Sequence, residues 1–339
     1  MKEALFYKNR AGIVRCRLCA RNCVIAEGKT GNCGVRENQG GKLFSLVFGR
    51  ACSIATDPIE KKPFFHFAPK TQTLSIATVG CNFHCTFCQN AEISQPEKIF
   101  GECAEPEALI KINKSQGFSW TYTEPTVFYE YFYETAKLCK KMKKNFYHTW
   151  VTNGYTSAEA IKKASKFLNA VNVDYKGDDK FYQELCSARL EPVQNALKAY
   201  KKNKIWIEIT NLLISGKNDS DEQIEEMVSW ITDNIGQVPL HFSRFFPHYK
   251  LNAPITPTAT LERAAAIAEK ELDYVYFGNI HHEKENTFCH NCKNMLIQRE
   301  GFFVVKIDLK KKGKSYRCPN CNEKIPLAGM DWTRMQTKD

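Results

Sequence analysis

The sequence has no long apolar run and nothing that resembles a secretory signal. Its first residues, MKEALFYKNRAG, contain neither an apolar core region nor a cleavage site. No stretch approaches the roughly 18 consecutive apolar residues that a membrane-spanning helix requires. These absences predict a cytoplasmic protein without a membrane span.

A reducing cytoplasm does not keep structural disulfides, so disulfide bonds do not account for the 15 cysteines among 339 residues. We expect four of them, Cys52, Cys103, Cys139 and Cys186, to be ordinary small buried residues. The others fall into three clusters, and clustered cysteines in a cytoplasmic chain indicate metal binding. The clusters are Cys16, Cys19, Cys23 and Cys33; Cys81, Cys85 and Cys88; and Cys289, Cys292, Cys318 and Cys321.

The formal net charge of +11, from 48 basic and 37 acidic residues, overstates how basic the protein is. Metal-bound thiolates are anionic, so one three-thiolate [4Fe–4S] cluster and two zinc sites of four thiolates each would remove about 5 charges. The basic runs at 140–144 and 310–314 have no interleaved aromatic residues, which stacking on nucleic-acid bases would require. We therefore do not expect a nucleic-acid partner.

Three regions follow one another along the chain. Residues 1–71 are rich in cysteine, glycine and charge, residues 72–285 alternate between strand-like and helix-like runs, and residues 286–339 carry two CxxC pairs. Helical candidates are 126–144, 157–168 and 259–272. Strand candidates are 73–79, 118–122, 146–152, 170–175, 205–214, 240–245 and 273–278.

Alternation of strand and helix at a spacing of roughly 30 residues indicates parallel βαβ units. We therefore predict the α/β class, as a partial or closed (β/α) barrel. An N-terminal metal-binding segment with four cysteines and a C-terminal zinc-ribbon-like module would flank it. Ligands of such sheets bind at the carboxyl ends of the strands.

The stretch TVGCNFHCTFCQN places Cys81, Cys85 and Cys88 directly after the first predicted barrel strand. Three thiolates can hold three irons of a [4Fe–4S] cluster and leave the fourth iron open, as in catalytic rather than structural metal sites. A zinc ion that borrows a fourth ligand such as His84 is the alternative. The CxxxCxxC spacing, with Phe87 before the last cysteine, resembles the signature of the radical S-adenosylmethionine (SAM) superfamily.

That resemblance implies a barrel of the radical SAM type, in which SAM binds the open iron and is cleaved by one electron to a 5′-deoxyadenosyl radical. YTEPT stands where the superfamily has a Gly-Gly-Glu-like element that receives the SAM amino group, and VDYK resembles the Asp-x-Lys element of glycyl-radical-enzyme activases. The expected cofactor-binding residues are Phe87, Tyr122, Thr123, Glu124, Thr152, Asn153, Asp174, Lys176 and Arg244.

Some of these positions have a plainer interpretation. Asp174 and Lys176 could form a structural ion pair at the barrel rim. Arg244 and His248, in FSRFFPHY at the end of the sixth strand, are candidates to face the substrate, and an ordinary rim histidine is the alternative for His248. No catalytic residue can be assigned from the sequence.

The two flanking clusters have different spacings. Cys16, Cys19, Cys23 and Cys33 follow the pattern C-x2-C-x3-C-x9-C, a closed set of four thiolates that suits either structural zinc or a second iron–sulfur cluster. CHNC and CPNC in the C-terminal region have zinc-ribbon spacing. Such ribbons bind nucleic acid or protein, or only stabilise a module with little core of its own.

Taken together, the segments CRLCARNC, DPIEKKPFFHF, TVGCNFHCTFCQN, TYTEPT, VTNGY, NVDYKG and KENTFCHNC resemble the radical SAM enzyme of the AmmeMemoRadiSam system, which is related to pyruvate formate-lyase-activating enzyme. Ala20 stands where proline is usual and Thr123 where asparagine is common. The additional ferredoxin-like cysteines of several activases are missing. The resemblance implies the two companion proteins of that system as partners.

Three functions compete on these observations. The leading one is an oxidoreductase or activating-enzyme-like radical SAM protein that takes electrons from flavodoxin or ferredoxin and abstracts hydrogen from a protein, small molecule or lipid. A zinc-rich module that binds nucleic acid or protein without catalysis is the alternative. A simple electron carrier is disfavoured because carriers close their clusters with a fourth cysteine.

Overall fold

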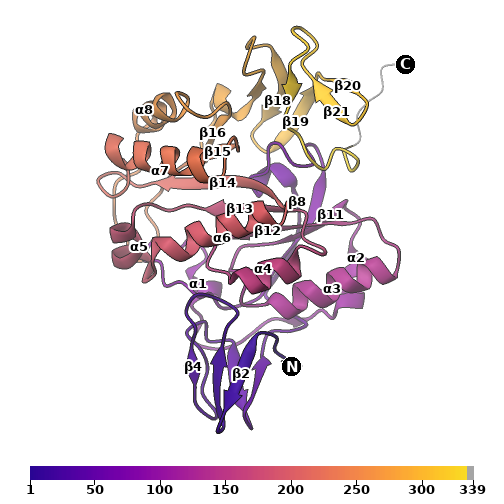
Figure 1. Ribbon diagram of the computed structural model, residues 1–339, viewed down its shortest axis with the longest axis vertical. Helices are drawn as coiled ribbons and strands as arrows, with labels where there is room; N and C mark the ends of the chain where they lie inside the picture. Colours follow the sequence, from indigo (N-terminus) through magenta and orange to yellow (C-terminus); the bar gives the residue numbers. More distant parts are fainter. Residues whose placement is uncertain (334–339) are drawn as a thin grey trace.

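The computed structural model describes residues 1–333 and is built around one eight-stranded sheet in the order β16-β15-β14-β13-β12-β11-β9-β8 (Figure 1). Neighbouring strands from β9 to β16 pair in parallel, and β8 pairs with β9 antiparallel. The strands are β8 (Ser53–Pro58), β9 (Gln72–Ala77), β11 (Gly117–Trp120), β12 (Tyr147–Thr152), β13 (Ala170–Asp174), β14 (Trp206–Leu213), β15 (Leu240–Arg244) and β16 (Val275–Gly278).

The parallel strands from β9 to β16 are largely buried on both faces, as parallel strands covered by helices must be, whereas β8 is partly exposed. Trp120, Tyr147 and Trp150, for example, are 0% exposed. Because apolar and β-branched residues run almost without interruption along each strand, the sequence pattern locates them well. The helices that connect them are α1 (Ala91–Ser94), α2 (Pro106–Ile112), α3 (Tyr129–Lys141), α4 (Ala158–Ala164), α5 (Asp179–Cys186), α6 (Leu190–Lys202), α7 (Asp221–Asn234) and α8 (Thr258–Ala268).

Side-chain caps define where several helices begin. Ser157 accepts a hydrogen bond from a first-turn N–H of α4, Asp178 does the same for α5, and Ser220 forms a reciprocal capping box with Gln223 at α7. Each cap satisfies a backbone N–H that has no partner within the helix. The loops at the carboxyl edge of the sheet therefore end at fixed points.

The predicted α/β class is confirmed, and the seven predicted strands all form, within two residues of the expected ends. Since β8 and β16 lie at opposite ends of the strand order and do not pair with each other in the described part of the chain, the barrel is partial. The sequence did not predict β8. The region 1–71, predicted as a separate N-terminal segment, thus contributes one strand to the barrel sheet.

The remaining N-terminal strands form small sheets below the barrel in Figure 1. A buried ion pair joins this segment to α3, because Arg36 donates to both carboxylate oxygens of Glu130 at 2.7 and 2.9 Å. The strands are β1 (Lys2–Glu3), β2 (Tyr7–Arg10), β3 (Ile13–Cys16), β4 (Val24–Ile25), β5 (Arg36–Gln39), β6 (Lys42–Ser45), and β7 (Arg50–Ala51), which pairs with β10 (Glu102–Cys103).

The C-terminal region packs against β16 and against the connector between β8 and β9, which begins with the 3-10 helix η1 (Ile59–Lys61). Arg299 donates to the carbonyl of Phe65 at 2.8 Å, and Phe67 forms a β-bridge with Ala328. This module thus covers the open side of the barrel (Figure 1). It contains η2 (Glu283–Glu285), β17 (Thr287–Phe288), β18 (Met295–Glu300), β19 (Phe303–Ile307), β20 (Lys310–Lys312), β21 (Ser315–Arg317) and β22 (Lys324–Ile325).

Within residues 1–333, none of the helices combines the length and the apolar character that crossing a bilayer would require.

Candidate functional site

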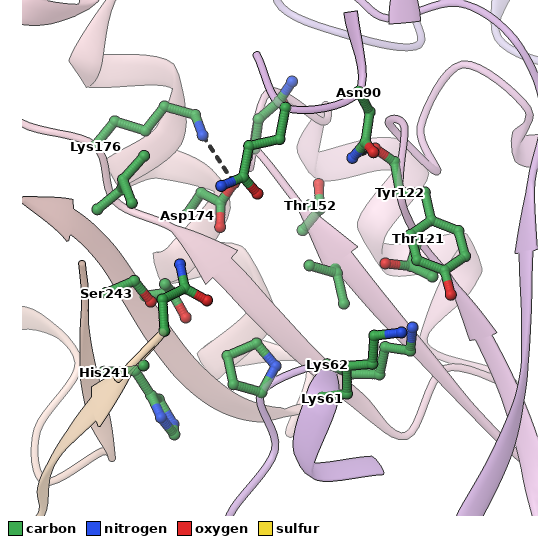
Figure 2. A pocket seen from close by; sticks show the side chains of 18 of the residues that line it. Lys61, Lys62, Asn90, Thr121, Tyr122, Thr152, Asp174, Lys176, His241 and Ser243 are labelled. Atoms are coloured by element: carbon green, nitrogen blue, oxygen red, sulfur yellow. Dashed lines mark hydrogen bonds and ion pairs between the residues drawn. The ribbon is translucent and has the colours of Figure 1, made fainter. Parts of the chain in front are cut away.

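A cavity of about 700 Å³ opens at the carboxyl ends of the parallel strands (Figure 2). The strand ends, the connector around Lys62 and the C-terminal residues Gly301 and Phe302 all contribute to its wall. It brings together most of the residues that the sequence nominated. These are Cys81, Cys85, Phe87, Cys88, Tyr122, Thr123, Glu124, Thr152, Asn153, Asp174 and Lys176.

The loop that carries Cys81, Cys85 and Cys88 follows β9 and is held by several short contacts. The Sγ of Cys81 accepts from the backbone N–H of Phe83 at 3.4 Å, and the Sγ of Cys88 lies 3.2 Å from the hydroxyl of Ser94. Burial raises the pKa of the Cys81 and Cys88 thiols. The fourth nearby cysteine, Cys186, hydrogen-bonds to Cys85 and lowers its pKa, but it does not line the cavity.

The turn before Cys81 requires a glycine. Gly80 has φ of +98°, and a Cβ at this position would lie 2.8 Å from the carbonyl oxygen of Cys33 and 2.6 Å from Val35. Any side chain there would therefore collide with the N-terminal segment as well as strain the backbone. The loop that carries Cys33 therefore lies directly against the loop that carries Cys81.

Glu124, just after β11, is a buried carboxylate that is 2% exposed. Oε1 accepts from the N–H and hydroxyl of Thr126 and from the hydroxyl of Thr152, and Oε2 accepts from the N–H of Asn153 at 2.8 Å. All of these donors are neutral, and burial raises the pKa of Glu124. A cationic group entering the cavity would complement this carboxylate, because a buried charge is costly unless it is paired.

Tyr122 adopts a backbone conformation that side chains rarely tolerate, with φ of +65°. Asn90 donates its Nδ2 to the Tyr122 carbonyl at 2.7 Å and Thr123 donates its hydroxyl to the carbonyl of Thr78 at 2.7 Å, so both residues are held in place. Positive φ at a bulky residue is a strain that surrounding contacts must impose, and such positions concentrate at functional sites.

The connector adds a charged group to the cavity that the sequence analysis missed. Lys61 and Lys62 donate to the two carboxylate oxygens of Asp57 at 2.9 and 2.8 Å, and the Tyr122 hydroxyl also donates to Asp57. Burial opposes ionisation of Asp57, but these hydrogen bonds outweigh it and lower its pKa. Burial lowers the pKa of Lys62 to about 8. The only sequence signal was the adjacent lysines of DPIEKKPFFHF.

Asp174 ends β13, Lys176 follows two residues later, and the two form an ion pair of 2.8 Å at the cavity wall (Figure 2). Burial opposes the charge on Lys176, yet the nearby Asp174 and Cys85 outweigh it and raise the lysine pKa. The ammonium also lies 5.8 Å from the ring centroid of Phe87. The two residues therefore form an ion pair in the cavity wall, and their contact with a cofactor stays a prediction.

Phe65 and His241, which line the cavity, are held by a buried carboxylate that the sequence did not predict. Glu208 on β14 is 0% exposed and accepts from the backbone N–H groups of Phe65 and His66, each at 2.9 Å. Its Oε2 also lies 2.8 Å from Nε2 of His241 on β15. Strands and connector are thereby joined beneath the cavity. No local pattern predicts this, because the connector and β14 lie more than a hundred residues apart.

Arg244 and His248 are not brought to the cavity. Arg244 directs its Nε to the carbonyl of Thr256 at 2.8 Å, and His248 is exposed in the following loop. Neither belongs to the residues that line the cavity. The end of β15 at Arg244 was predicted correctly, but the Arg244 side chain bonds to Thr256 and does not enter the cavity.

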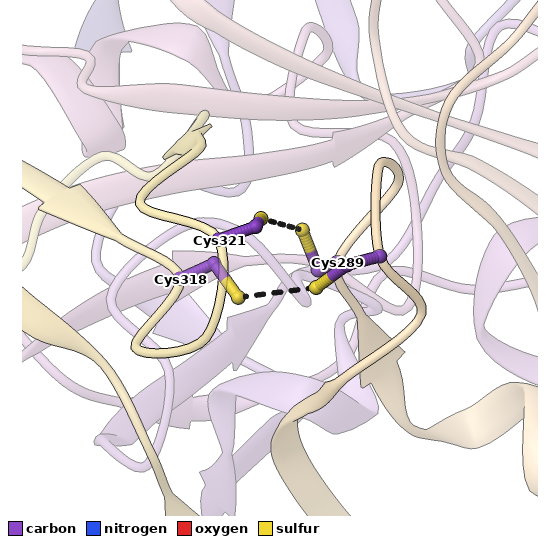
Figure 3. Close-up of side chains that lie close together, drawn as sticks. Cys289, Cys318 and Cys321 are labelled. Atoms are coloured by element: carbon purple, nitrogen blue, oxygen red, sulfur yellow. Dashed lines mark hydrogen bonds between the residues drawn. The ribbon is translucent and has the colours of Figure 1, made fainter.

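The C-terminal cysteines converge on one point (Figure 3). The Sγ atoms of Cys289 and Cys321 lie 3.6 Å apart, as do those of Cys292 and Cys318, and all four lie within 4.8 Å of one another. Tetrahedral zinc with Zn–S bonds of about 2.3 Å requires sulfurs about 3.8 Å apart. This four-cysteine cluster therefore has the form of a zinc-ribbon-like metal site.

The N-terminal cysteines Cys16, Cys19, Cys23 and Cys33 also meet, around a small cavity of about 20 Å³ next to Asn82. Burial raises the pKa of Cys19 to about 12 and that of Cys33 to about 11. Crowded buried thiols with such values favour the neutral form until a cation binds them.

Known proteins resemble the chain in sequence and in fold. A model of the radical SAM superfamily matches residues 75–231. "Uncharacterized protein MJ0808" of Methanocaldococcus jannaschii is 44% identical over 337 residues, covering 96% of this chain and 99% of that protein. "Uncharacterized protein MJ0674" of the same organism is 25% identical over 286 residues, covering 77% of this chain and 76% of that protein.

Among solved structures, a radical SAM methyltransferase from Sphaerobacter thermophilus superimposes with a TM-score of 0.52 at 15% identity, over 62% of this chain and 68% of that one. At this identity the likeness shows the fold alone. The barrel thus has the fold of radical SAM proteins, and the chain belongs to one family with MJ0808.

Proposed function

We propose that this protein holds a [4Fe–4S] cluster through Cys81, Cys85 and Cys88, cleaves SAM reductively and abstracts hydrogen from a substrate in the same cavity. The cluster and SAM, when bound, supply the 5′-deoxyadenosyl radical. The observation that carries the proposal is that these three thiols line one large cavity, to which no other cysteine within residues 1–333 contributes. Three ligands leave one iron open for a cofactor.

The spacing of the thiols supports iron–sulfur over zinc at this loop. Among residues 1–333, only the C-terminal set has three or more ligand atoms mutually within 4.8 Å. Cys81, Cys85 and Cys88 are therefore more widely spaced than a single zinc ion would require. His84, the fourth ligand of the zinc alternative, does not line the cavity.

The residues around the cysteines suit the charges of SAM. The Glu124 carboxylate has only neutral donors and would accept the SAM ammonium group, while Thr152 and Asn153 hold that carboxylate in place. Lys176 lies at the cavity wall with a raised pKa and would bind the SAM carboxylate. The strained backbone at Tyr122 fixes the intervening loop. These side chains orient the cofactor, and the surrounding wall excludes water.

We infer that the substrate is a small organic molecule or a single extended peptide segment. A ligand of SAM's size already needs a pocket of roughly 300 Å³ or more, so it takes a large share of the 700 Å³ available. The connector closes the floor and the C-terminal module covers the open side. The cations Lys61 and Lys62 in the wall count against a lipid tail. An activase role, with a backbone glycine as target, rests on the resemblance of VDYK.

The other assignments belong to the same proposal. Zinc at the C-terminal cysteines is supported by their 3.6 Å sulfur separations. A reduced flavodoxin or ferredoxin would supply electrons at low potential, and a reducing cytoplasm suits the fifteen unpaired thiols. Membership of the AmmeMemoRadiSam system, and its companion proteins as partners, are supported by the combined motifs from CRLCARNC to KENTFCHNC.

The test is release of 5′-deoxyadenosine. Protein loaded with iron and sulfide under nitrogen and reduced with dithionite should form it from SAM, and Cys85→Ser should form none. Cys103→Ser is the matched control, because Cys103 is an exposed cysteine on β10, outside the cavity. If the cluster-loaded protein makes no 5′-deoxyadenosine, or Cys85→Ser makes as much as Cys103→Ser, the proposed function is wrong.

A further inference from the structure

The four N-terminal cysteines form a metal site that the proposed function does not use. Cys16 ends β3, Cys19 and Cys23 lie in the turn that leads to β4, and Cys33 follows in the next loop, so that all four thiols line one small cavity. The remaining wall is largely apolar, with Leu18, Ile25 and Val127. Four converging thiolates form a closed set that leaves no coordination position for substrate.

The separation of these thiols distinguishes two kinds of metal site. Zinc draws four sulfurs to about 3.8 Å from one another. A [4Fe–4S] cubane holds its four thiolate sulfurs roughly 6 Å apart, because four irons and four sulfides lie between them. In the described part of the chain, the four sulfurs of the C-terminal set all lie within 4.8 Å of one another. No three of the sulfurs of Cys16, Cys19, Cys23 and Cys33 lie that close together. The N-terminal thiols are therefore more widely spaced than a single zinc ion requires, which favours the larger cubane.

The N-terminal cysteines lie against the loop that would hold the SAM-binding cluster. The Cys33 carbonyl packs against Gly80, the residue before Cys81. The carbonyl of Asn82, the residue after it, accepts from Nε of Arg21 at 2.8 Å and from Nδ2 of Asn32 at 3.1 Å. The residues before and after Cys81 therefore both contact the loops that carry the N-terminal cysteines.

A hydrogen-bonded side chain strengthens this connection. Asn153 donates its Nδ2 to Oδ1 of Asn82 at 2.8 Å, and the same nitrogen lies 3.7 Å from the Sγ of Cys81. Asn82 also lines the small N-terminal cavity. Cys19, Cys23 and Cys33 are each partly exposed, whereas Cys16 is buried. The N-terminal site thus lies between the protein surface and the catalytic cysteines.

We propose that Cys16, Cys19, Cys23 and Cys33 hold a second [4Fe–4S] cluster, which passes single electrons from a low-potential donor protein to the SAM-binding cluster. The inference rests on the proposed function. The donor is oxidised by one electron, the second cluster is reduced from its 2+ to its 1+ state, and it is then reoxidised as the SAM-binding cluster is reduced. Cleavage of one C–S bond of SAM consumes that electron.

The first experiment counts metals in full-length protein purified and loaded under nitrogen. We expect about eight irons and one zinc per chain. Cys19→Ser/Cys33→Ser should lose about four irons but keep the zinc and the cluster whose electron paramagnetic resonance (EPR) signal shifts when SAM is added. Cys103→Ser is again the control. About four irons and two zincs in the unchanged protein would overturn the inference.

A complementary variant keeps the test valid if the N-terminal substitutions impair folding. Cys81→Ser/Cys85→Ser/Cys88→Ser leaves the N-terminal ligands intact. It should retain about four irons and show, after reduction, an EPR signal that does not respond to SAM. Loss of all iron from this variant would refute the second cluster. Zinc at the N-terminal site together with continued 5′-deoxyadenosine formation would refute this inference but leave the proposed function standing.

The second experiment tests electron transfer without measuring catalysis. The rate at which the SAM-sensitive EPR signal appears is compared for reduced flavodoxin and for dithionite, a small reductant that can reach the cavity. We expect the flavodoxin-to-dithionite ratio to fall at least about tenfold in Cys19→Ser/Cys33→Ser, because the route from the surface is interrupted. An unchanged ratio would mean that the second cluster is structural and would overturn the relay.

Discussion

Arg36→Met should destabilise the protein far more than the loss of an ordinary surface ion pair. Arg36 and Glu130 are each 2% exposed and join the N-terminal segment to α3 through hydrogen bonds of 2.7 and 2.9 Å. The substitution keeps the apolar bulk but removes the charge, so that Glu130 stays buried with the N–H of Leu5 as its remaining donor. Breaking a buried pair from one side costs about 3–5 kcal/mol.

This loss can be converted into a melting temperature. An unfolding entropy of about 2.1 cal/mol/K per residue gives roughly 0.7 kcal/mol/K for the 339-residue chain, so we expect a fall of about 4–7 °C. Calorimetry on metal-loaded protein under nitrogen would measure it. The double variant Arg36→Met/Glu130→Leu should recover most of the loss, because neither charge is then left buried alone.

The matched control is Arg17→Met. Arg17 pairs with Glu159 at 3.4 Å, but their side chains are 45% and 59% exposed, and such pairs contribute about 1 kcal/mol or less. The reasoning would be refuted if Arg36→Met lost no more stability than Arg17→Met. It would also be refuted if the double variant were less stable than Arg36→Met alone.

Three further predictions address the cofactor, the C-terminal metal and pH. Glu124→Gln should weaken SAM binding roughly 10- to 150-fold in titration calorimetry, because it removes a charge-assisted hydrogen bond; equal affinity would exclude the ammonium contact. Cys292→Ser/Cys318→Ser should lose one zinc and make residues 286–333 sensitive to protease, and retained zinc would contradict the assignment. Burial lowers the pKa of His66 to about 4, below its unfolded value of about 6.5, so the unfolded chain binds a proton more readily between pH 7 and 5. The free energy of unfolding, measured with urea, should therefore fall by about 2 kcal/mol from pH 7 to pH 5. An equal fall in His66→Gln would exclude this histidine as the cause.

The strands of the barrel and the catalytic loop were predictable because both depend on residues close together in the chain. Each predicted strand is a short run rich in apolar and β-branched residues, and Cys81, Cys85 and Cys88 lie within one loop directly after such a run. Because these strands are parallel, their carboxyl ends lie at one edge of the sheet, and Glu124 and Asp174 are therefore brought to the same edge. β8 was not predicted, because its sequence SIATDP has no apolar run, and Asp57 is its only buried residue.

The walls of the cavity could not be predicted, because they come from contacts between distant parts of the chain. Arg299 and Phe65 are separated by 234 positions, and Glu208 and Phe65 by 143. Arg244 shows the reverse case, since its strand end was correctly placed but its side chain bonds to Thr256 outside the cavity. Side-chain direction at a rim depends on the neighbouring loop, which periodicity does not describe.

The order of amino acids alone determined the βα alternation, the three groups of thiols and the open three-cysteine spacing, because each depends on residues a few positions apart. Only the tertiary structure decided which thiols stand close enough for zinc and which stand farther apart. It also decided that the N-terminal loops rest against Gly80 and Asn82 and that the C-terminal module closes the barrel. Sulfur separations of a few ångströms between loops depend on how those loops pack, and packing sums many long-range contacts that no local pattern contains.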